Sequence, residues 1–215
     1  MNPIRQYFLV FALLLAFIGI TGCSSTSMER SNAARVSLQT MDNDIQSAML
    51  QLDDTGRSLD NLINIPQGDL NKVFDTYSDN VLQITSVEQK FARHATEMTS
   101  RGIDYFEEWQ KEGTAYKNPR IQQLSDQRRA ALGEMYDKIA KNSVGINETF
   151  KTYVSDVKEI QAFLSNDLTA KGISAIAPTS QKVISEGDSL MVALKNVQAA
   201  IQGTREEMSQ SRNGM

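Results

Sequence analysis

The side chain with the clearest chemistry in this 215-residue sequence is Cys23, the only cysteine. It directly follows an Ile-Thr-Gly sequence at residues 20–22. A basic Arg5 and a nearly unbroken apolar run at residues 7–20 come before it. A positive start, an apolar centre and small residues before a cleavage point are typical of a secretory signal peptide. We therefore expect residues 1–22 to be removed and the thiol of Cys23 to be acylated.

This arrangement resembles the signal of a bacterial lipoprotein, in which the acylated cysteine becomes the first residue of the mature chain. The lipid would attach the chain to the cell envelope, so a membrane bound through acylated Cys23 is its first expected partner. By resemblance to enterobacterial sorting, Ser24 rather than Asp after the cysteine favours the periplasmic face of the outer membrane. Residues 24–30 are small and polar. We expect residues 23–30 to form a flexible lipidated tether.

The side chains that catalysis or metal binding would need are scarce elsewhere. His94 is the only histidine, so the sequence contains neither a histidine pair for zinc nor an HExxH motif. The motifs GxSxG, GxGxxG and GxxxxGK are also missing. Residues 42–44, Asp-Asn-Asp, begin like a calcium loop but lack its glycine, and we interpret them as solvated surface. We expect no enzyme activity, no cofactor and no bound metal.

Composition limits the class of partner. The net charge is −4, and removal of residues 1–22 takes away Arg5 and no acidic residue, which leaves −5. Because a mildly acidic chain offers no broad basic surface, we expect no nucleic acid partner. The single thiol cannot form a disulfide within the chain, so the fold must be stabilised by packing. Few prolines and aromatics, with many helix-forming residues, favour an all-α fold.

Four segments after the tether carry apolar residues at alternating steps of three and four, the pattern of amphipathic helices with coiled-coil-like packing. The first predicted helix spans about 30–64 and the third 119–164; the stripe of the second runs from Leu70 to Trp109, with Gly113 near its end, and that of the fourth from Ile173 to Met208. The predicted buried positions of the first helix are Leu38, Met41, Ile45, Ala48, Leu52, Thr55, Leu59 and Leu62. The short connections force sequential helices to lie antiparallel. The sequence therefore predicts an elongated antiparallel four-helix bundle over residues 31–211.

The third helix has a less regular pattern than the others. Its predicted buried positions have a mean step of about 3.6, which should make it straighter than a strict heptad helix. These positions begin with Ile121, Leu124, Arg128, Leu132, Met135, Ile139 and Asn142. In the fourth helix, Pro178 should either kink the helix or divide a short first turn from the main rod.

Several polar residues fall on the predicted buried faces, and they allow two interpretations. They could line a site inside the bundle, or they could fix the register of the helices at some cost in stability. The second interpretation is the commoner one. The residues concerned are Glu88, Arg128, Asn142, Ser180 and Thr204.

The connection between the second and third helices is the predicted interaction patch, formed by Tyr105, Trp109, Glu112, Tyr116 and Arg120. Acidic residues at the end of one helix and a basic residue at the start of the next oppose both helix dipoles. Pairing across the turn would resolve this conflict, and a charged patch for a partner is the alternative. The aromatic residues likewise fit either a patch or simple core.

A set of residues around this connection resembles a known family. They are Phe106-Glu-Glu-Trp109, Tyr116, Ile121, Ser125, Arg128, Arg129 and Tyr136, with Gly68-Asp69-Leu70 and Tyr77 further upstream. This pattern resembles the bacterial lipoproteins grouped as domain-of-unknown-function family 2959, and the similarity covers most of the mature chain. The resemblance implies a helical envelope lipoprotein. That family has no assigned activity, so the resemblance supplies no catalytic residue.

These observations favour a non-enzymatic, lipid-anchored helical protein that acts as a spacer, scaffold or protein-interaction module, with an envelope protein as partner. The alternative is a periplasmic chaperone or carrier that binds a lipophilic ligand or an unfolded envelope client. Counting helix passes from Cys23 predicts that the connection between the second and third helices lies near the membrane.

Overall fold

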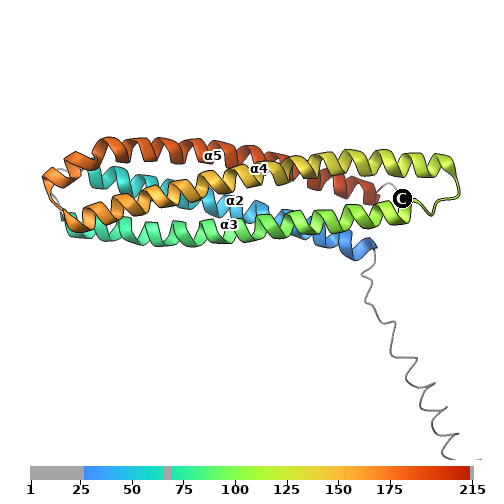
Figure 1. Cartoon of the computed structure of the whole chain (residues 1–215), viewed down its shortest axis with the longest axis horizontal. Helices are drawn as coiled ribbons and strands as arrows, with labels where there is room; N and C mark the ends of the chain where they lie inside the picture. The colour runs from blue at the N-terminus through green and yellow to red at the C-terminus, as the bar shows by residue number, and fades with distance from the viewer. Residues whose placement is uncertain (1–26, 65–68, 214–215) are drawn as a thin grey trace, which may run out of the picture.

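The computed structural model describes residues 27–64 and 69–213, which form four long helices. These are α2 (Ser27–Asn64), α3 (Leu70–Gly113), α4 (Pro119–Asn166) and α5 (Ala170–Asn213). The described residues contain no strand, and the predicted all-α, elongated antiparallel four-helix bundle is confirmed (Figure 1). The predicted signal peptide, residues 1–22, and Cys23 lie outside the described residues.

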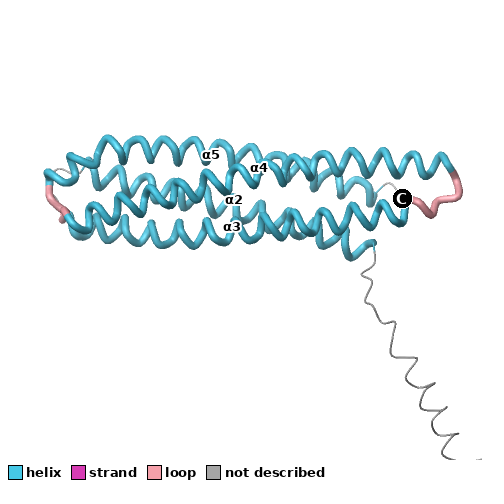
Figure 2. The backbone as a smooth tube through the Cα atoms, viewed as in Figure 1, coloured by secondary structure: helices cyan, strands magenta, loops and turns pink. Residues whose placement is uncertain are grey.

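The four helices lie side by side in a ring. α2 packs against α3 and α5, and α4 packs against the same two helices. Figure 2 shows long helices joined by short connections at the two ends of the rod. The start of α2, the α3–α4 connection and the end of α5 lie at one end, and the α4–α5 turn lies at the other (Figure 1).

The helix boundaries follow local sequence signals. Asp69 caps α3 by accepting a hydrogen bond from the backbone N–H of Lys72 at 3.3 Å, and Pro119 occupies the first turn of α4. α2 already begins at Ser27, so the last residues of the expected tether are helical rather than flexible. α5 continues through Pro178, which therefore does not divide it.

The core consists of the faces that the periodicity predicts. In α2, all eight predicted positions are buried: Leu38, Met41, Ile45, Ala48, Leu52, Thr55, Leu59 and Leu62. The centres of α3 and α5 are buried at the predicted spacing as well. Amphipathic faces that repeat every three or four residues bury one continuous apolar stripe per helix, which explains the agreement.

The register predicted for α4 is wrong in part. Its buried positions from Leu132 to Leu164 alternate steps of four and three, so α4 is as regular as its neighbours. Tyr136 and Ser143 are buried, whereas Asn142 is exposed. The sequence did not single out Tyr136 and Ser143, because Met135, next to Tyr136, fits a stripe of buried positions with a mean step of about 3.6 residues.

The start of α4 departs from the prediction for a different reason. Ile121 and Leu124 were expected in the core, yet both are exposed. The α3–α4 hairpin extends past the ends of α2 and α5 (Figure 1). The first turns of α4 therefore have no complete bundle around them.

Candidate functional site

The hairpin end, meaning the last turns of α3, the connection and the first turns of α4, contains the predicted interaction patch. α3 ends at Gly113, and Asn118 starts α4 by accepting a hydrogen bond from the backbone N–H of Arg120 at 3.0 Å. Trp109 on α3 donates its indole N–H to the hydroxyl of Ser125 on α4 at 2.9 Å. This bond joins the two helices close to the turn.

Four aromatic rings form an aromatic cluster just inside this end: Tyr105, Phe106, Trp109 and Tyr136. The ring centroids of Tyr105 and Phe106 are 4.9 Å apart, and Phe106 meets Tyr136 edge-on at 5.7 Å. Burial raises the pKa of the Tyr105 hydroxyl, whereas a hydrogen bond with Ser31 and the charge of Arg128 lower it. The cluster packs α3 against α4 and stabilises this part of the hairpin.

The five residues of the predicted patch fall into two groups. Tyr105 and Trp109 are half-buried members of the aromatic cluster, whereas Glu112, Tyr116 and Arg120 are exposed at the tip. The first group therefore serves the packing of the hairpin, and the second faces solvent. A binding role for these residues stays a prediction.

The charges near this end join neighbouring helices. Arg30 on α2 forms an ion pair with Glu108 on α3 at 2.7 Å, and Lys111 lies 3.7 Å from the same carboxylate. The hydrogen bond from Arg30 is the main reason that the pKa of Glu108 is lowered. Arg128 on α4 pairs with the carboxylate of Glu207 on α5 and also donates to its backbone carbonyl at 2.7 Å. Glu108 at the end of α3 is thus paired with Arg30 on α2 and with Lys111 on its own helix, not across the turn.

Two buried carboxylates on α2 form a second polar region, which we call the polar waist. Asp44 contacts His94 and lies 3.1 Å from Lys90, both on α3. Asp42 accepts a hydrogen bond from Gln198 on α5 at 2.7 Å, and Arg205 lies 3.4 Å away. Both carboxylates are buried, so the interpretation of residues 42–44 as solvated surface is wrong for Asp42 and Asp44, although Asn43 is exposed.

The signal for this burial was present in the sequence. Asp42 follows the core residue Met41, and Asp44 precedes the core residue Ile45, so the two acids flank the apolar stripe. Flanking positions of a coiled-coil seam are where charges from neighbouring helices meet. The sequence alone does not reveal that partners on α3 and α5 would cover them.

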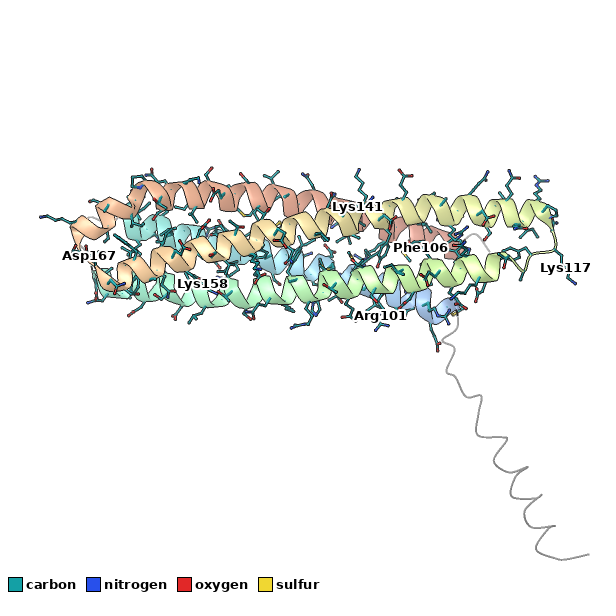
Figure 3. All side chains as sticks on the ribbon, in the orientation of Figure 1. Arg101, Phe106, Lys117, Lys141, Lys158 and Asp167 are labelled. Atoms are coloured by element: carbon teal, nitrogen blue, oxygen red, sulfur yellow. The ribbon has the colours of Figure 1, made fainter. Side chains whose placement is uncertain are left out.

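A groove of about 840 Å³ runs between α3 and α4 beside the aromatic cluster, lined by Gly102, Ile103, Phe106, Gly133 and Tyr136 among others. Figure 3 shows Phe106 between the two helices. The Tyr136 hydroxyl donates to the carbonyl of Met98 at 2.8 Å and is hydrogen-bonded to Ser37 on α2 at 3.2 Å. Gly102 allows the ring to lie directly against α3, since a Cβ there would be 2.2 Å from Tyr136 Cε1.

The described ranges, 27–64 and 69–213, contain neither a cluster suited to a metal ion nor a helix suited to a membrane span. They contain no group of three His, Cys, Asp or Glu side chains that could hold a metal ion together. None of their helices combines the length and apolar character needed to cross a membrane.

Together these features define a class of protein: a rod-shaped, all-helical bundle with hydrogen bonds and ion pairs between its helices and a projecting hairpin. The chain belongs to the family described as proteins of unknown function DUF2959, whose sequence model matches residues 25–209. The match extends over all four helices and confirms membership of this family, whereas the lipoprotein character that the resemblance implied stays a prediction. No curated protein and no solved structure matches the chain.

Proposed function

We propose that this protein is a lipid-anchored helical rod of the bacterial cell envelope that acts without catalysis as a spacer or scaffold. The observation that carries this proposal is that the two ends of the rod differ in the segments they contain. The start of α2 and the α3–α4 hairpin lie at one end, tied by the Arg30–Glu108 ion pair. Cys23 precedes Ser27 by only four residues. An acylated Cys23 would therefore attach the rod to the membrane by this end.

The length of the rod suits a spacer. α4 alone has 48 residues, which at 1.5 Å per residue corresponds to about 72 Å. The buried carboxylates support a structural role, because Asp42 and Asp44 are each held by side chains of a neighbouring helix. We further propose the periplasmic face of the outer membrane as its location and another envelope protein as its partner.

The anchor is tested by replacing Cys23 with serine in the chain expressed with its signal. We expect Cys23→Ser to abolish acylation, seen by mass spectrometry, and to release the protein from the membrane fraction or leave it unprocessed. Ser25→Ala is the matched control, and it should be acylated and membrane-bound. Normal processing and membrane retention of the Cys23→Ser protein would refute the anchor.

The groove between α3 and α4 favours a second candidate function, the carriage of a lipophilic ligand or an unfolded envelope client. Ile103, Phe106 and Tyr136 give the groove apolar surface that a ligand could use. Mass spectrometry of the protein purified from membranes separates the two functions. A reproducibly co-purified lipid that Ile103→Asp removes would favour the carrier. An intact protein partner with no bound ligand would favour the scaffold.

A further inference from the structure

The tip of the α3–α4 hairpin combines exposed apolar side chains with basic ones. Tyr116, Ile121 and Leu124 are 43%, 49% and 59% exposed. Lys117 and Arg120 lie among them in the sequence, and both are exposed. Figure 3 shows Lys117 at the extreme end of the rod, pointing away from the bundle.

The exposure of the apolar residues follows from the construction of the hairpin. Ile121 lies one turn before Ser125, which bonds to Trp109, and Leu124 lies one turn before Arg128, which pairs with Glu207. Both residues thus continue the inward faces of α4 beyond the point where α2 and α5 end (Figure 1). The two aliphatic side chains therefore continue the packed faces of α4 into solvent.

The charge of the tip differs from that of the rest of the chain. Residues 111–124 contain three basic residues and one acidic residue, although the whole chain has a net charge of −4. Residues 159–171, around the turn at the opposite end, contain one basic and two acidic residues. An anionic surface therefore attracts the hairpin tip more strongly than the far end.

The chain that precedes α2 limits where such a surface lies. Arg30, in the first turn of α2, contacts Glu108 on the hairpin. Three residues separate Ser27 from Cys23, and the four residue-to-residue steps between them span at most about 14 Å when extended. If Cys23 carries a lipid, as proposed above, the head groups of that bilayer lie within reach of the tip.

We propose that the tip, formed by Tyr116, Lys117, Arg120, Ile121 and Leu124, docks onto the anionic phospholipid bilayer that holds the Cys23 lipid. The basic side chains contact head groups, while the tyrosine ring and the two aliphatic side chains enter the interfacial layer. The protein then has two attachment points, the lipid and the tip. This second contact holds the rod upright instead of leaving it to tilt on its tether.

The test uses the full chain purified from membranes and reconstituted into vesicles that contain anionic phospholipid and a lipid-borne quencher. Because Cys23 is acylated, Thr114→Cys or Ser165→Cys provides one free thiol for a fluorescent label. The first label reports on the tip and the second on the opposite end, about 70 Å away along α4. We expect strong quenching of the Thr114 label and none of the Ser165 label.

Matched variants separate the charge from the apolar contribution. One basic residue near an anionic surface strengthens binding by about fivefold, so Lys117→Gln with Arg120→Gln should reduce the docked-to-undocked ratio by about 25-fold. Lys141→Gln with Lys158→Gln makes the same charge change farther along α4 and should leave quenching unchanged. Ile121→Ser with Leu124→Ser should also reduce quenching, whereas Val144→Ser, another exposed site on α4, should not.

The lipid anchor and the tip contact give different results when either is absent. Acylated protein that floats with the vesicles but shows equal, weak quenching at both labels would overturn the tip contact and retain the anchor. In that case the tip is left for a protein partner. If the chain proves to be unacylated, the labels are placed in Cys23→Ser protein, and a Thr114 label that is still quenched would overturn the anchor and uphold the tip. Unacylated protein that stays in solution would overturn both.

Discussion

Truncation of Phe91 to alanine should test the packing of the bundle directly. The Phe91 side chain on α3 is fully buried, and its ring centroid lies 6.0 Å from that of Phe150 on α4. Burying an aromatic side chain removes roughly 150–250 Å² from water, which at about 25 cal/mol per Å² corresponds to about 4–6 kcal/mol. Truncations of buried Phe typically cost about 3–5 kcal/mol, and we expect Phe91→Ala to fall in this range.

The assay is reversible unfolding by urea and by heat, followed by circular dichroism. For a chain of this size, about 3–5 kcal/mol corresponds to a decrease in Tm of roughly 6–20 °C. Phe163→Ala makes the same change at a position that is 39% exposed, and it should cost less than about 1 kcal/mol. A double variant with Phe150→Ala would isolate the ring–ring term, expected at about 0.5–1.5 kcal/mol.

One result would refute the reasoning. If Phe91→Ala cost no more than Phe163→Ala, Phe91 would have to face solvent. The register of α3 against α4 would then be wrong, and so would the contacts that the residues next to Phe91 make with the buried face of α4.

Three further predictions concern single positions. Asp44→Ala should lower the free energy of unfolding, measured in urea, by about 1–3 kcal/mol, because the variant lacks a buried hydrogen-bond acceptor. The control Asp53→Ala breaks an exposed ion pair and should change the free energy of unfolding by less than about 1 kcal/mol. Gly102→Ala should destabilise the bundle by about 1–3 kcal/mol, because the added Cβ would overlap Tyr136. In the control Gly133→Ala the added Cβ meets open space, and the change should stabilise α4 by about 0.5–1 kcal/mol. A Gly102→Ala protein that melts at a higher temperature than the unchanged protein would contradict the close contact. Burial raises the pKa of Tyr136 from 10.0 to about 12, so its contribution to stability is fully present below pH 10, and about 3 kcal/mol should be lost as the pH rises through 12. Urea unfolding across this range should show a smaller loss for Tyr136→Phe, and an identical loss would contradict a raised pKa at this residue.

The sequence predicted the helices and most of the core because both depend on local periodicity. Every predicted position of α2 was correct, from Leu38 to Leu62, since one helical face must be apolar wherever it is covered. Capping by Asp69 and the start of α4 at Pro119 were also predictable, because these signals act within one turn.

What the sequence could not predict depends on the relative positions of distant segments. Ile121 and Leu124 are exposed because α4 extends beyond its neighbours, and no local pattern states where α2 and α5 end in space. Asp42 is buried because Gln198, 156 residues away, reaches it from α5. Gly102 was a signal that a large side chain such as Tyr136 is buried, since a glycine on a buried face leaves space for a large side chain on the facing helix.

The polar waist gives the bundle a property that its apolar stripes cannot supply. Because a seam repeats every seven residues, α3 could slide along α2 by one repeat, about 10 Å, and still present apolar residues to it. Asp44 would then lose Lys90 and His94. In one direction it would face Glu97 and Arg101, and in the other it would face uncharged side chains. A buried carboxylate without its partners is costly, so these pairs select one register even where they add little stability. The proposed spacer role requires a rod of defined length, and the register of the helices sets that length.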